Sequence, residues 1–372
     1  MSVAESILKE TKLPPSNPLP SLMKAAVYRG KGRICVESIP TPAIGFGEMM
    51  VEVRSCGVCH TDLKKIEHDL LVPPRIYGHE TAGIVAAVGE GVTRFAPGDR
   101  VVAFHHIPCG RCFYCQRRLY AQCPVYKKVG ITAGFEPAGG GFSQYVRVMD
   151  WIVERGVESI PNGVSFDQAC WVEPVNTCLK GIKLLDLRQN EIVAVLGQGP
   201  IGLIFTMMAA RAGATVLATD AIEFRRQLSE RYGARAFDPR HSAFSGAVAE
   251  ITDGRGVDAV IVATSAPGLV EQALKISRPG AKVLLFAQTS KTERIEIAGA
   301  DICVGERMLL GSYSADVDLQ AESARLVFSG ALPLEDLISH RMSLDEIERG
   351  IAVARHPDGQ SLKVVIHPQE HA

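Results

Sequence analysis

The stretch from Glu191 to Asp220 constrains the fold more than any other part of the chain. It reads EIVAVLGQGPIGLIFTMMAARAGATVLATD: an apolar run, a glycine-rich turn, a helical apolar stretch, a second apolar run and an acid. A lone G-x-G-x-x-G is a weak signal, but this whole order of elements is specific to a dinucleotide-binding β-α-β unit. Further apolar runs alternate with helical stretches at 257–264, 281–288 and 307–313. This alternation predicts a doubly wound parallel sheet of the Rossmann type.

The glycine-rich turn within this stretch predicts where a dinucleotide binds. Five residues form it: Gly197, Gly199, Pro200, Ile201 and Gly202. Glycines let the backbone approach a pyrophosphate, and the N-terminus of the following helix faces the negative charge. Asp220 can accept hydrogen bonds from both ribose hydroxyls and would repel a 2′-phosphate, so we expect NAD rather than NADP. Arg225 and Arg226 lie close enough to affect this preference, or could form a solvated helix face.

Four cysteines lie close together in PCGRCFYCQRRLYAQC (108–123). They are Cys109, Cys112, Cys115 and Cys123, with the spacing C-x2-C-x2-C-x7-C. Two disulfides, an iron–sulfur cluster or one metal ion could explain such a set, but a bacterial ferredoxin run places its fourth cysteine after three residues. Four thiolates that leave no open position describe a structural zinc site, which stabilises a loop and does no chemistry itself.

Basic residues around the same loop raise a second possibility, a zinc ribbon that binds nucleic acid. They are Arg111, Arg117, Arg118, Lys127 and Lys128. The whole chain carries a net charge of −1, whereas proteins dedicated to nucleic acids or membrane surfaces normally carry a basic excess. We therefore expect a solvated basic loop, and no nucleic-acid or membrane partner.

The length of 372 residues exceeds one ordinary core and suits two domains. No apolar run reaches the roughly 20 residues that span a bilayer. The first 22 residues, MSVAESILKETKLPPSNPLPSL, lack the basic and apolar segments of a secretory signal and predict a flexible extension. Without export, the expected compartment is the reducing cytoplasm, where clustered cysteines bind metal more often than they form disulfides.

Two stretches suggest a second metal site of a different kind. They read SCGVCHTDLKK (55–65) and YGHETAGIVAAVGEGVTRFAPGDRV (77–101), and they place Cys59, His79 and Glu80 at strand–turn positions. An open zinc site needs about three protein ligands, drawn from His, Cys and carboxylate, with one position left for substrate. Together the stretches predict a catalytic zinc ion.

The same stretches carry a resemblance that runs from about Met23 to the C-terminus. The pattern G-H-E-x2-G-x5-G-x2-V is met by Gly78, His79, Glu80, Gly83, Gly89 and Val92, and the pattern G-x-C-x-T-D by Gly57, Cys59, Thr61 and Asp62. With the cysteine loop at the corresponding place, the chain resembles the zinc-dependent medium-chain alcohol dehydrogenases, which include sorbitol and threonine dehydrogenases. The resemblance implies an α/β protein with a GroES-like β-rich catalytic domain and a Rossmann NAD-binding domain. The expected ranges are 1–22 for the extension, 23–176 and 314–372 for the catalytic domain, 105–125 for its zinc lobe, and 177–313 for the Rossmann domain.

This resemblance makes Cys59 and His79 the first two ligands of the catalytic zinc. Alcohol dehydrogenases place a cysteine ligand before the glycine-rich turn, where this chain has Glu173 in CWVEPVNTCLKGI. Polyol dehydrogenases carry this Glu-Pro pair, and either Glu80 or Glu173 could be the direct third ligand. Three cysteines out of step with the motifs are expected to be structural: Cys56, Cys170 and Cys178.

The resemblance also implies roles in binding the cofactor and in proton transfer. Thr177 matches a threonine beside the nicotinamide, and Lys363 matches a basic residue that contacts the pyrophosphate. Thr61 matches the hydroxyl of the proton relay, with Asp62 supporting the ligands. The relay histidine of alcohol dehydrogenases is replaced by Lys64, so Lys64, water or a carboxylate at the zinc would complete the relay.

The expected protein is therefore an NAD-dependent enzyme with two zinc ions per chain, one catalytic and one structural. It would transfer a hydride from a small secondary alcohol or polyol to NAD and release a ketone. Primary alcohols and threonine remain open as substrates. The rival classes are a zinc-free quinone reductase, which the zinc motifs oppose, and a zinc-stabilised nucleotide-binding or structural relic. A homodimer or homotetramer is expected, with the strand at 307–313 as a candidate for pairing across subunits.

Overall fold

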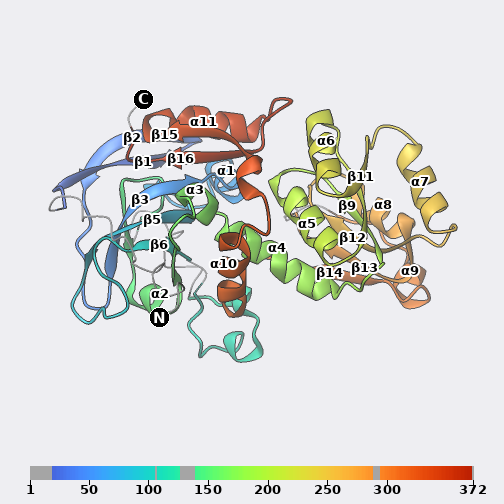
Figure 1. The fold of residues 1–372 in the computed structure, drawn as a ribbon, viewed down its shortest axis with the longest axis horizontal. Helices are drawn as coiled ribbons and strands as arrows, with labels where there is room; N and C mark the ends of the chain where they lie inside the picture. The colour runs from blue at the N-terminus through green and yellow to red at the C-terminus, as the bar shows by residue number, and fades with distance from the viewer. Residues whose placement is uncertain (1–18, 105–106, 126–138, 288–293, 371–372) are drawn as a thin grey trace, which may run out of the picture. The chain divides into compact units, whose positions relative to one another are not determined.

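The computed structural model describes residues 19–104, 107–125, 139–287 and 294–370, in two compact units (Figure 1). Unit 1 holds the described residues up to Glu173, then Gln320–Pro357 and the residues from Lys363 on. Unit 2 holds Pro174–Leu319 and Asp358–Leu362. The expected domain boundaries, with the Rossmann domain at 177–313, stay predictions. Most of the expected extension (1–18) lies outside the described residues, as do Lys127 and Lys128.

Unit 2 is built on a six-stranded sheet with the order β11-β10-β9-β12-β13-β14, and every pair in it is parallel. Its strands are β9 (Ile192–Leu196), β10 (Thr215–Thr219), β11 (Ala234–Phe237), β12 (Val257–Val262), β13 (Ser277–Leu285) and β14 (Met308–Gly311). The order reverses between β9 and β12, which confirms the doubly wound Rossmann sheet. Both strands are central and covered on two faces, so each reads as an almost continuous apolar run.

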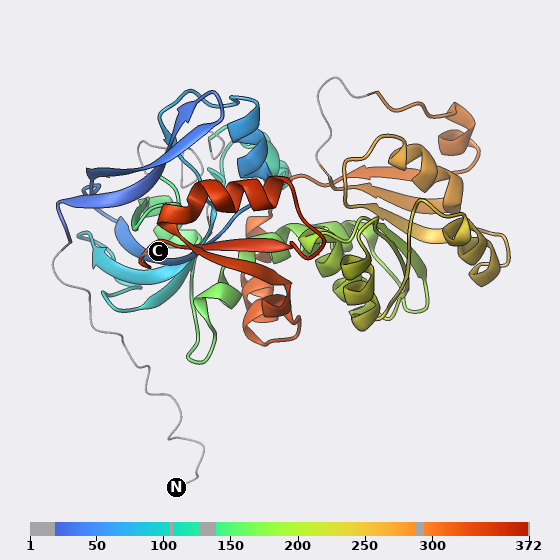
Figure 2. The same cartoon turned by 90° about the horizontal axis from the view of Figure 1, so that it is seen from above.

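Helices cover both faces of this sheet (Figures 1 and 2). They are α4 (Val172–Leu185), which begins at the end of unit 1, α5 (Pro200–Arg211), α6 (Glu223–Arg231), α7 (Ala243–Ile251), α8 (Leu269–Ile276) and α9 (Gly299–Cys303). One apolar core joins α7 and α8 to β9 and β10, through Phe244 and Leu274 against Leu196 and Leu217. The opposite face carries α5, which is buried from Gly202 to Ala209 because it is apolar nearly all round.

Unit 1 is rich in antiparallel strands. Its large sheet runs β15-β16-β3-β5-β6-β8, with β7 also paired to β3, and its small sheet runs β2-β1-β4. The strands are β1 (Leu22–Gly30), β2 (Arg33–Pro40), β3 (Met49–Gly57), β4 (Arg75–Ile76), β5 (Glu80–Val88), β6 (Arg100–Ala103), β7 (Tyr145–Val148), β8 (Val157–Ser159), β15 (Ile338–Ser343) and β16 (Lys363–His367). Figure 1 shows the C-terminal strands, in red, beside β3, in blue.

Short helices close the loops of unit 1. They are α1 (His60–Glu67), α2 (Asp150–Arg155), α3 (Phe166–Ala169), α10 (Gln320–Phe328) and α11 (Ile347–Arg355). The antiparallel pairing of β3 with β5 places Gly57 opposite Glu80, where one strand ends and the other begins. The turn from β3 into α1 therefore meets the start of β5, and the two predicted ligand motifs come together there.

In the ranges that the structure describes, no helix combines the length and the apolar character that a bilayer span requires.

Candidate zinc sites and dinucleotide-binding turn

Three potential metal ligands gather where β3 ends and β5 begins. Cys59 is the N-cap of α1, His79 directly precedes β5 and Glu80 is the first residue of β5. The ligand atoms of Cys59, His79 and Glu80 lie within 4.8 Å of one another. His79 and Glu80 are buried and Cys59 is half-buried, so this set has a protected side and an accessible side. One thiolate, one imidazole and one carboxylate form a donor set that suits zinc.

Asp62 holds two of these residues in place. Its carboxylate lies 3.1 Å from Nδ1 of His79 and accepts a hydrogen bond of 3.2 Å from the backbone N–H of Cys59. Burial alone would lower the pKa of His79, but Asp62 and Cys59 outweigh it and raise that pKa well above its usual range. Because Nδ1 faces Asp62, a metal ion would bind through the other ring nitrogen, beside the Cys59 thiol. Metal binding there must release a proton.

Lys363 forms a buried ion pair with Glu80. Burial lowers the pKa of Lys363, but the charges of Glu80 and Cys59 outweigh it and raise that pKa. The ammonium nitrogen also lies 5.2 Å from the ring centre of Trp171. A Cβ on Gly57 would approach Oε2 of Glu80 to 1.9 Å, so only glycine leaves room for this carboxylate. The structure thus places Lys363 at the cluster, and its expected contact with a pyrophosphate stays a prediction.

Glu173 lies in the same charged neighbourhood but outside the 4.8 Å set. Its side chain is buried at the start of α4. Burial raises the pKa of Glu173 to about 7, with His79 acting against the shift and Glu80 adding to it. Four potential anions meet here: Cys59, Asp62, Glu80 and Glu173. The cations facing them, His79 and Lys363, are fewer, so the site favours an added divalent cation.

The two residues predicted for proton transfer lie on α1. Thr61 and Lys64 are both half-buried there. Burial and the charge of Lys64 lower the pKa of the adjacent His60. Thr61 follows the potential ligand Cys59 by two residues and Lys64 follows it by five, and the roles of both residues stay predictions.

The four-cysteine loop brings its sulfur atoms into one cluster. The Sγ atoms of Cys109, Cys112, Cys115 and Cys123 lie within 4.8 Å of one another. The Sγ–Sγ distances are 3.4 Å from Cys112 to Cys115 and 3.9 Å from Cys109 to Cys115. A tetrahedral ion with Zn–S bonds of about 2.3 Å needs sulfurs roughly 3.8 Å apart. All ten cysteines of the chain are free thiols, so the loop fits a closed zinc site rather than two disulfides.

The thiol chemistry of the loop agrees with this fit. Hydrogen bonds from the backbone N–H groups of Arg111 and Cys112 lower the pKa of Cys109 to about 6, against the effect of burial. A thiolate at neutral pH is the form that binds zinc. The three cysteines expected to be structural, Cys56, Cys170 and Cys178, are fully buried.

The glycine-rich turn of unit 2 has the geometry of a phosphate cradle. Gly197 has φ of +93°, and a Cβ on Gly202 would lie 1.8 Å from the carbonyl oxygen of Gly197. Gly199 is the N-cap of α5 and Pro200 opens the helix. Ile201 follows in the first turn. The free N–H groups of this helix end are suited to bind a pyrophosphate.

Asp220 and Arg225 complete the surroundings of this turn. Asp220 accepts hydrogen bonds from the backbone N–H groups of Gln198 (2.7 Å) and Ile222 (2.8 Å). The Arg225 guanidinium donates to the carbonyl of Ser361 (2.9 Å) and lies 4.0 Å from the Asp220 carboxylate. Its Nη1 would be 3.8 Å from a Cβ on Gly199. Arg225 is therefore a partly buried cation beside the turn.

The neighbouring Arg226 is also engaged, with the carbonyl of Asp220 (2.7 Å) and the carboxylate of Asp238 (3.5 Å). Both arginines are mostly buried, so the solvated helix face is not what the structure shows. Thr177 donates to the carbonyl of Pro174 (2.8 Å) on α4. Sequence reasoning missed Ser361, which belongs to unit 2 although it lies far along the chain.

Comparisons with known proteins match both halves of the chain. Residues 45–157 match the model of the alcohol dehydrogenase GroES-like domain, and residues 200–329 match that of zinc-binding dehydrogenases. The chain is 28% identical to a sorbitol dehydrogenase of Bacillus subtilis, over 94% of this chain and 98% of that protein. It is 31% identical to an L-threonine 3-dehydrogenase of Symbiobacterium thermophilum, over 90% and 94%.

A solved structure extends the likeness to three dimensions. It is a zinc-binding dehydrogenase from Sinorhizobium meliloti bound to NADP, with a TM-score of 0.84 and 31% identity, and the match covers 94% of this chain and all of that one. The chain belongs to the zinc-dependent medium-chain alcohol dehydrogenases, in the branch of the polyol and threonine dehydrogenases. It is an oxidoreductase with a GroES-like unit and a Rossmann unit, as the sequence predicted.

A matched pair of substitutions separates the two metal sites. We expect Cys59→Ser to lower turnover at least about 100-fold, because substitution of residues that only hydrogen-bond to metal ligands already lowers metal affinity or activity 10- to 100-fold. We expect its melting temperature to be nearly unchanged. We expect Cys112→Ser to lower the melting temperature by at least about 5 °C, because a closed zinc lobe contributes folding free energy. Zinc analysis should give about two ions for the parent and about one for each variant. Full activity in Cys59→Ser, or parent-like melting in Cys112→Ser, would contradict the assignment.

Proposed function

We propose that this chain is an NAD-dependent dehydrogenase of small secondary alcohols or polyols, which it oxidises to ketones, and that it holds one catalytic and one structural zinc ion. One observation carries the proposal: Cys59, His79 and Glu80 lie within 4.8 Å of one another, with Asp62 hydrogen-bonded to His79. A zinc ion held by this set would polarise the substrate hydroxyl and favour loss of its proton near neutral pH.

The residues of the chain would prepare the site in three ways. Asp62 fixes the ring of His79 and the N-terminus of α1. Lys363 offsets the negative charge of Glu80. We propose Glu80 as the direct third ligand because it belongs to the 4.8 Å set, with Glu173 as a second carboxylate that acts through water.

Proton transfer would begin at Thr61, whose hydroxyl can accept the substrate proton and donate its own. Thr61 lies two residues from the ligand Cys59 at the start of α1. Lys64 stands one turn further on, at the position of the family's relay histidine. We propose that Lys64 or water passes the proton outward, with Glu173 as the carboxylate alternative.

The cofactor would bind at the turn of unit 2, through Gly197, Gly199, Pro200, Ile201 and Gly202. The Asp220 carboxylate would accept hydrogen bonds from the ribose hydroxyls, and a 2′-phosphate would meet its charge, so NAD is favoured. Arg225 would offset the pyrophosphate charge from beside Gly199. Thr177 and Lys363 are proposed as further cofactor contacts. The NADP bound in the Sinorhizobium meliloti protein shows that a similar chain accepts the phosphate.

The relatives support the substrate class. The sorbitol dehydrogenase and a D-altritol 5-dehydrogenase of Agrobacterium fabrum, 30% identical to this chain, are named for polyols, and Glu173-Pro174 matches their branch. The L-threonine 3-dehydrogenase supports threonine-type amino alcohols as the second candidate. A cytoplasmic location is also proposed, because the cysteine loop requires reduced thiols.

A screen for NAD reduction tests the function directly. Zinc-replete protein is assayed with polyols, simple secondary alcohols, primary alcohols and threonine at equal concentrations. We expect the highest kcat/KM with a polyol or secondary alcohol. Highest values with threonine would favour the second candidate. Absence of turnover with every alcohol, in a protein holding two zinc ions, would contradict the proposal.

The variant Asp220→Asn tests the cofactor preference. Loss of charge-assisted hydrogen bonds worth about 1.5–3 kcal/mol should raise the KM for NAD about 10- to 100-fold and leave the KM for NADP unchanged or lower. Asp238→Asn is the matched control, since this carboxylate pairs with Arg226 and Arg240 and is not expected to contact cofactor. An equal change in the KM values for NAD and NADP would contradict the proposed preference for NAD. Melting curves of both variants show whether either is unfolded.

A homo-oligomer is proposed through the edge of the unit 2 sheet, where β14 is the last strand. An exposed edge readily pairs with another chain. Light scattering should therefore report a mass of two or four times 40.1 kDa. A mass of 40.1 kDa at micromolar concentration would exclude it.

A further inference from the structure

A group of charged and polar side chains in unit 1 surrounds Asp167, on α3. One carboxylate oxygen of Asp167 accepts hydrogen bonds from Ser55 Oγ (2.6 Å) and His367 Nε2 (2.7 Å). The other accepts one from Arg341 Nε (2.6 Å). We call these four residues, Ser55, Asp167, Arg341 and His367, the Asp167 anchor. Its members come from β3, α3, β15 and β16, so the anchor ties four separate elements together.

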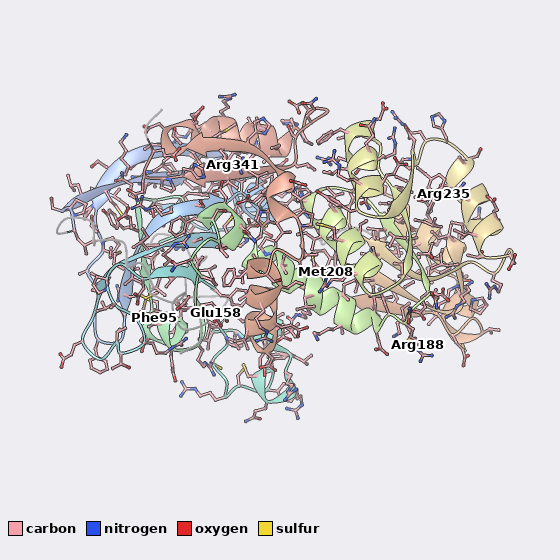
Figure 3. The ribbon with its side chains drawn as sticks, viewed as in Figure 1. Phe95, Glu158, Arg188, Met208, Arg235 and Arg341 are labelled. Atoms are coloured by element: carbon pink, nitrogen blue, oxygen red, sulfur yellow. The ribbon has the colours of Figure 1, made fainter. Side chains whose placement is uncertain are left out.

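The anchor is partly enclosed and strongly charged. The side chains of Asp167 and His367 are each 13% exposed, whereas Arg341, labelled in Figure 3, is 46% exposed. Burial would raise the pKa of Asp167, but its three donors hold that pKa well below the usual range. The second ring nitrogen of His367 lies 3.3 Å from the Glu370 carboxylate. With carboxylates on both sides, His367 is best satisfied as an imidazolium, in which both nitrogens donate.

The anchor joins two segments that both lead to the group of Cys59, His79 and Glu80, which we call the zinc cluster. The first is β16, with His367 at one end and Lys363, the partner of Glu80, at the other. The second is residues 167–173, which ends at Glu173. The anchor and the zinc cluster thus lie at opposite ends of the same two segments.

The segment 167–173 is packed tightly enough to transmit a displacement. Between its ends, Ala169, Cys170, Trp171 and Val172 are fully buried. The thiol of Cys170 donates to the carbonyl of Asp167 (3.1 Å), and the N–H of Trp171 donates to the carbonyl of Gln168 (3.2 Å). Close-packed interiors do not absorb small shifts. A four-residue helix such as α3 is not stable by itself, so its position depends on outside contacts such as the anchor.

We infer that Asp167, with Ser55, Arg341 and His367, positions Glu173 and Lys363 at the catalytic zinc cluster, and that the proton on His367 makes the hold on the catalytic ion depend on pH. This inference rests on the proposed function, because it assumes that the cluster binds zinc. It assigns no chemistry to the anchor, whose residues do not belong to the 4.8 Å set of potential ligands. Its members are positioning residues.

The sign of the pH effect follows from His367. The hydrogen bond to Asp167 raises the pKa of His367, burial acts against this, and the Asp167 and Glu370 charges add to it. A raised folded-state pKa contributes stability that is fully present below the unfolded value of about 6.5 and is lost as pH rises through the raised value. Asp167 stays ionised across this window, because its donors lower its pKa. Above the window the anchor keeps its hydrogen bonds and loses one positive charge.

The test compares Asp167→Asn with Asp345→Asn in the full-length zinc protein. Asp345 is a matched control, because it is a carboxylate of unit 1 paired with Lys24 (3.0 Å) on the surface. The readouts are the rate at which a chelator removes the catalytic ion and the absorption spectrum after cobalt replaces that ion. We expect Asp167→Asn to release the ion about 10-fold faster and to alter the cobalt spectrum, by analogy with residues behind metal ligands. Asp345→Asn should match the parent.

His367→Gln is the second variant, in case Asp167→Asn does not fold. Glutamine keeps a donor for Asp167 but cannot carry the charge. We expect it to release the ion about 2- to 5-fold faster than the parent at pH 6.5, the effect of one partly exposed ion pair, and at the parent's rate at pH 9. At each pH the release rate of His367→Gln is divided by that of the parent, and this ratio cancels the pH dependence of the metal ligands themselves.

The outcomes separate this inference from the proposed function. One outcome would overturn the inference alone. The parent would hold two zinc ions, and the variants would melt at lower temperature but show the parent's release rates and cobalt spectra. The anchor would then have only a structural role. A ratio for His367→Gln that stays constant with pH would overturn its pH dependence. A parent that holds only the four-cysteine zinc would overturn both.

Discussion

The antiparallel pairing of β3 with β5 is the constraint on which the catalytic cluster depends. It places Gly57 opposite Glu80, and so brings the turn that carries Cys59 against the residues that open β5. Hydrogen bonds of the sheet fix this register, and a slip by one residue would turn Glu80 to the other face. Asp62 then couples the turn to His79. A rigid sheet thus supplies the precision that a metal site needs, although two of the proposed ligands, Cys59 and His79, stand on turns.

Charge balance explains the choice of residues around the cluster. Cys59, Glu80 and Glu173 are potential anions in a mostly buried place, and burial of uncompensated charge is costly. Lys363 compensates one of them through its ion pair with Glu80. A divalent cation would compensate most of the rest. The pKa of Glu173 is raised mainly by burial, and the charge of Glu80 adds to the shift. The cluster is accordingly easier to understand as an ion-binding site than as a stabilising network.

Features with local signatures could be predicted from the sequence. The strand, glycine turn, helix and acid at 191–220 lie within one β-α-β unit, and the four cysteines lie on one loop, so spacing alone defines both. Cys59 and His79 stand in motifs that the family resemblance identifies. Contacts between distant segments left no such signal. The pairing of Lys363 with Glu80, the donors around Asp167 and the place of Ser361 beside Arg225 depend on tertiary structure, and spacing in the sequence does not encode it.

The position of β16 between β15 and β3 in the unit 1 sheet has a consequence for biosynthesis. The strand is hydrogen-bonded to β3, yet it is synthesised only after residues 174–319 of unit 2. Most of unit 2 lies between these two strands in the chain, so it can fold during translation while unit 1 still lacks a strand. Domains tend to fold as they emerge, and pairings between distant segments form late. Assembly of the proposed catalytic cluster, with Lys363 in place, therefore has to wait until β16 has been synthesised. Binding of a metal ion at the complete cluster would then follow the folding of the nucleotide-binding unit.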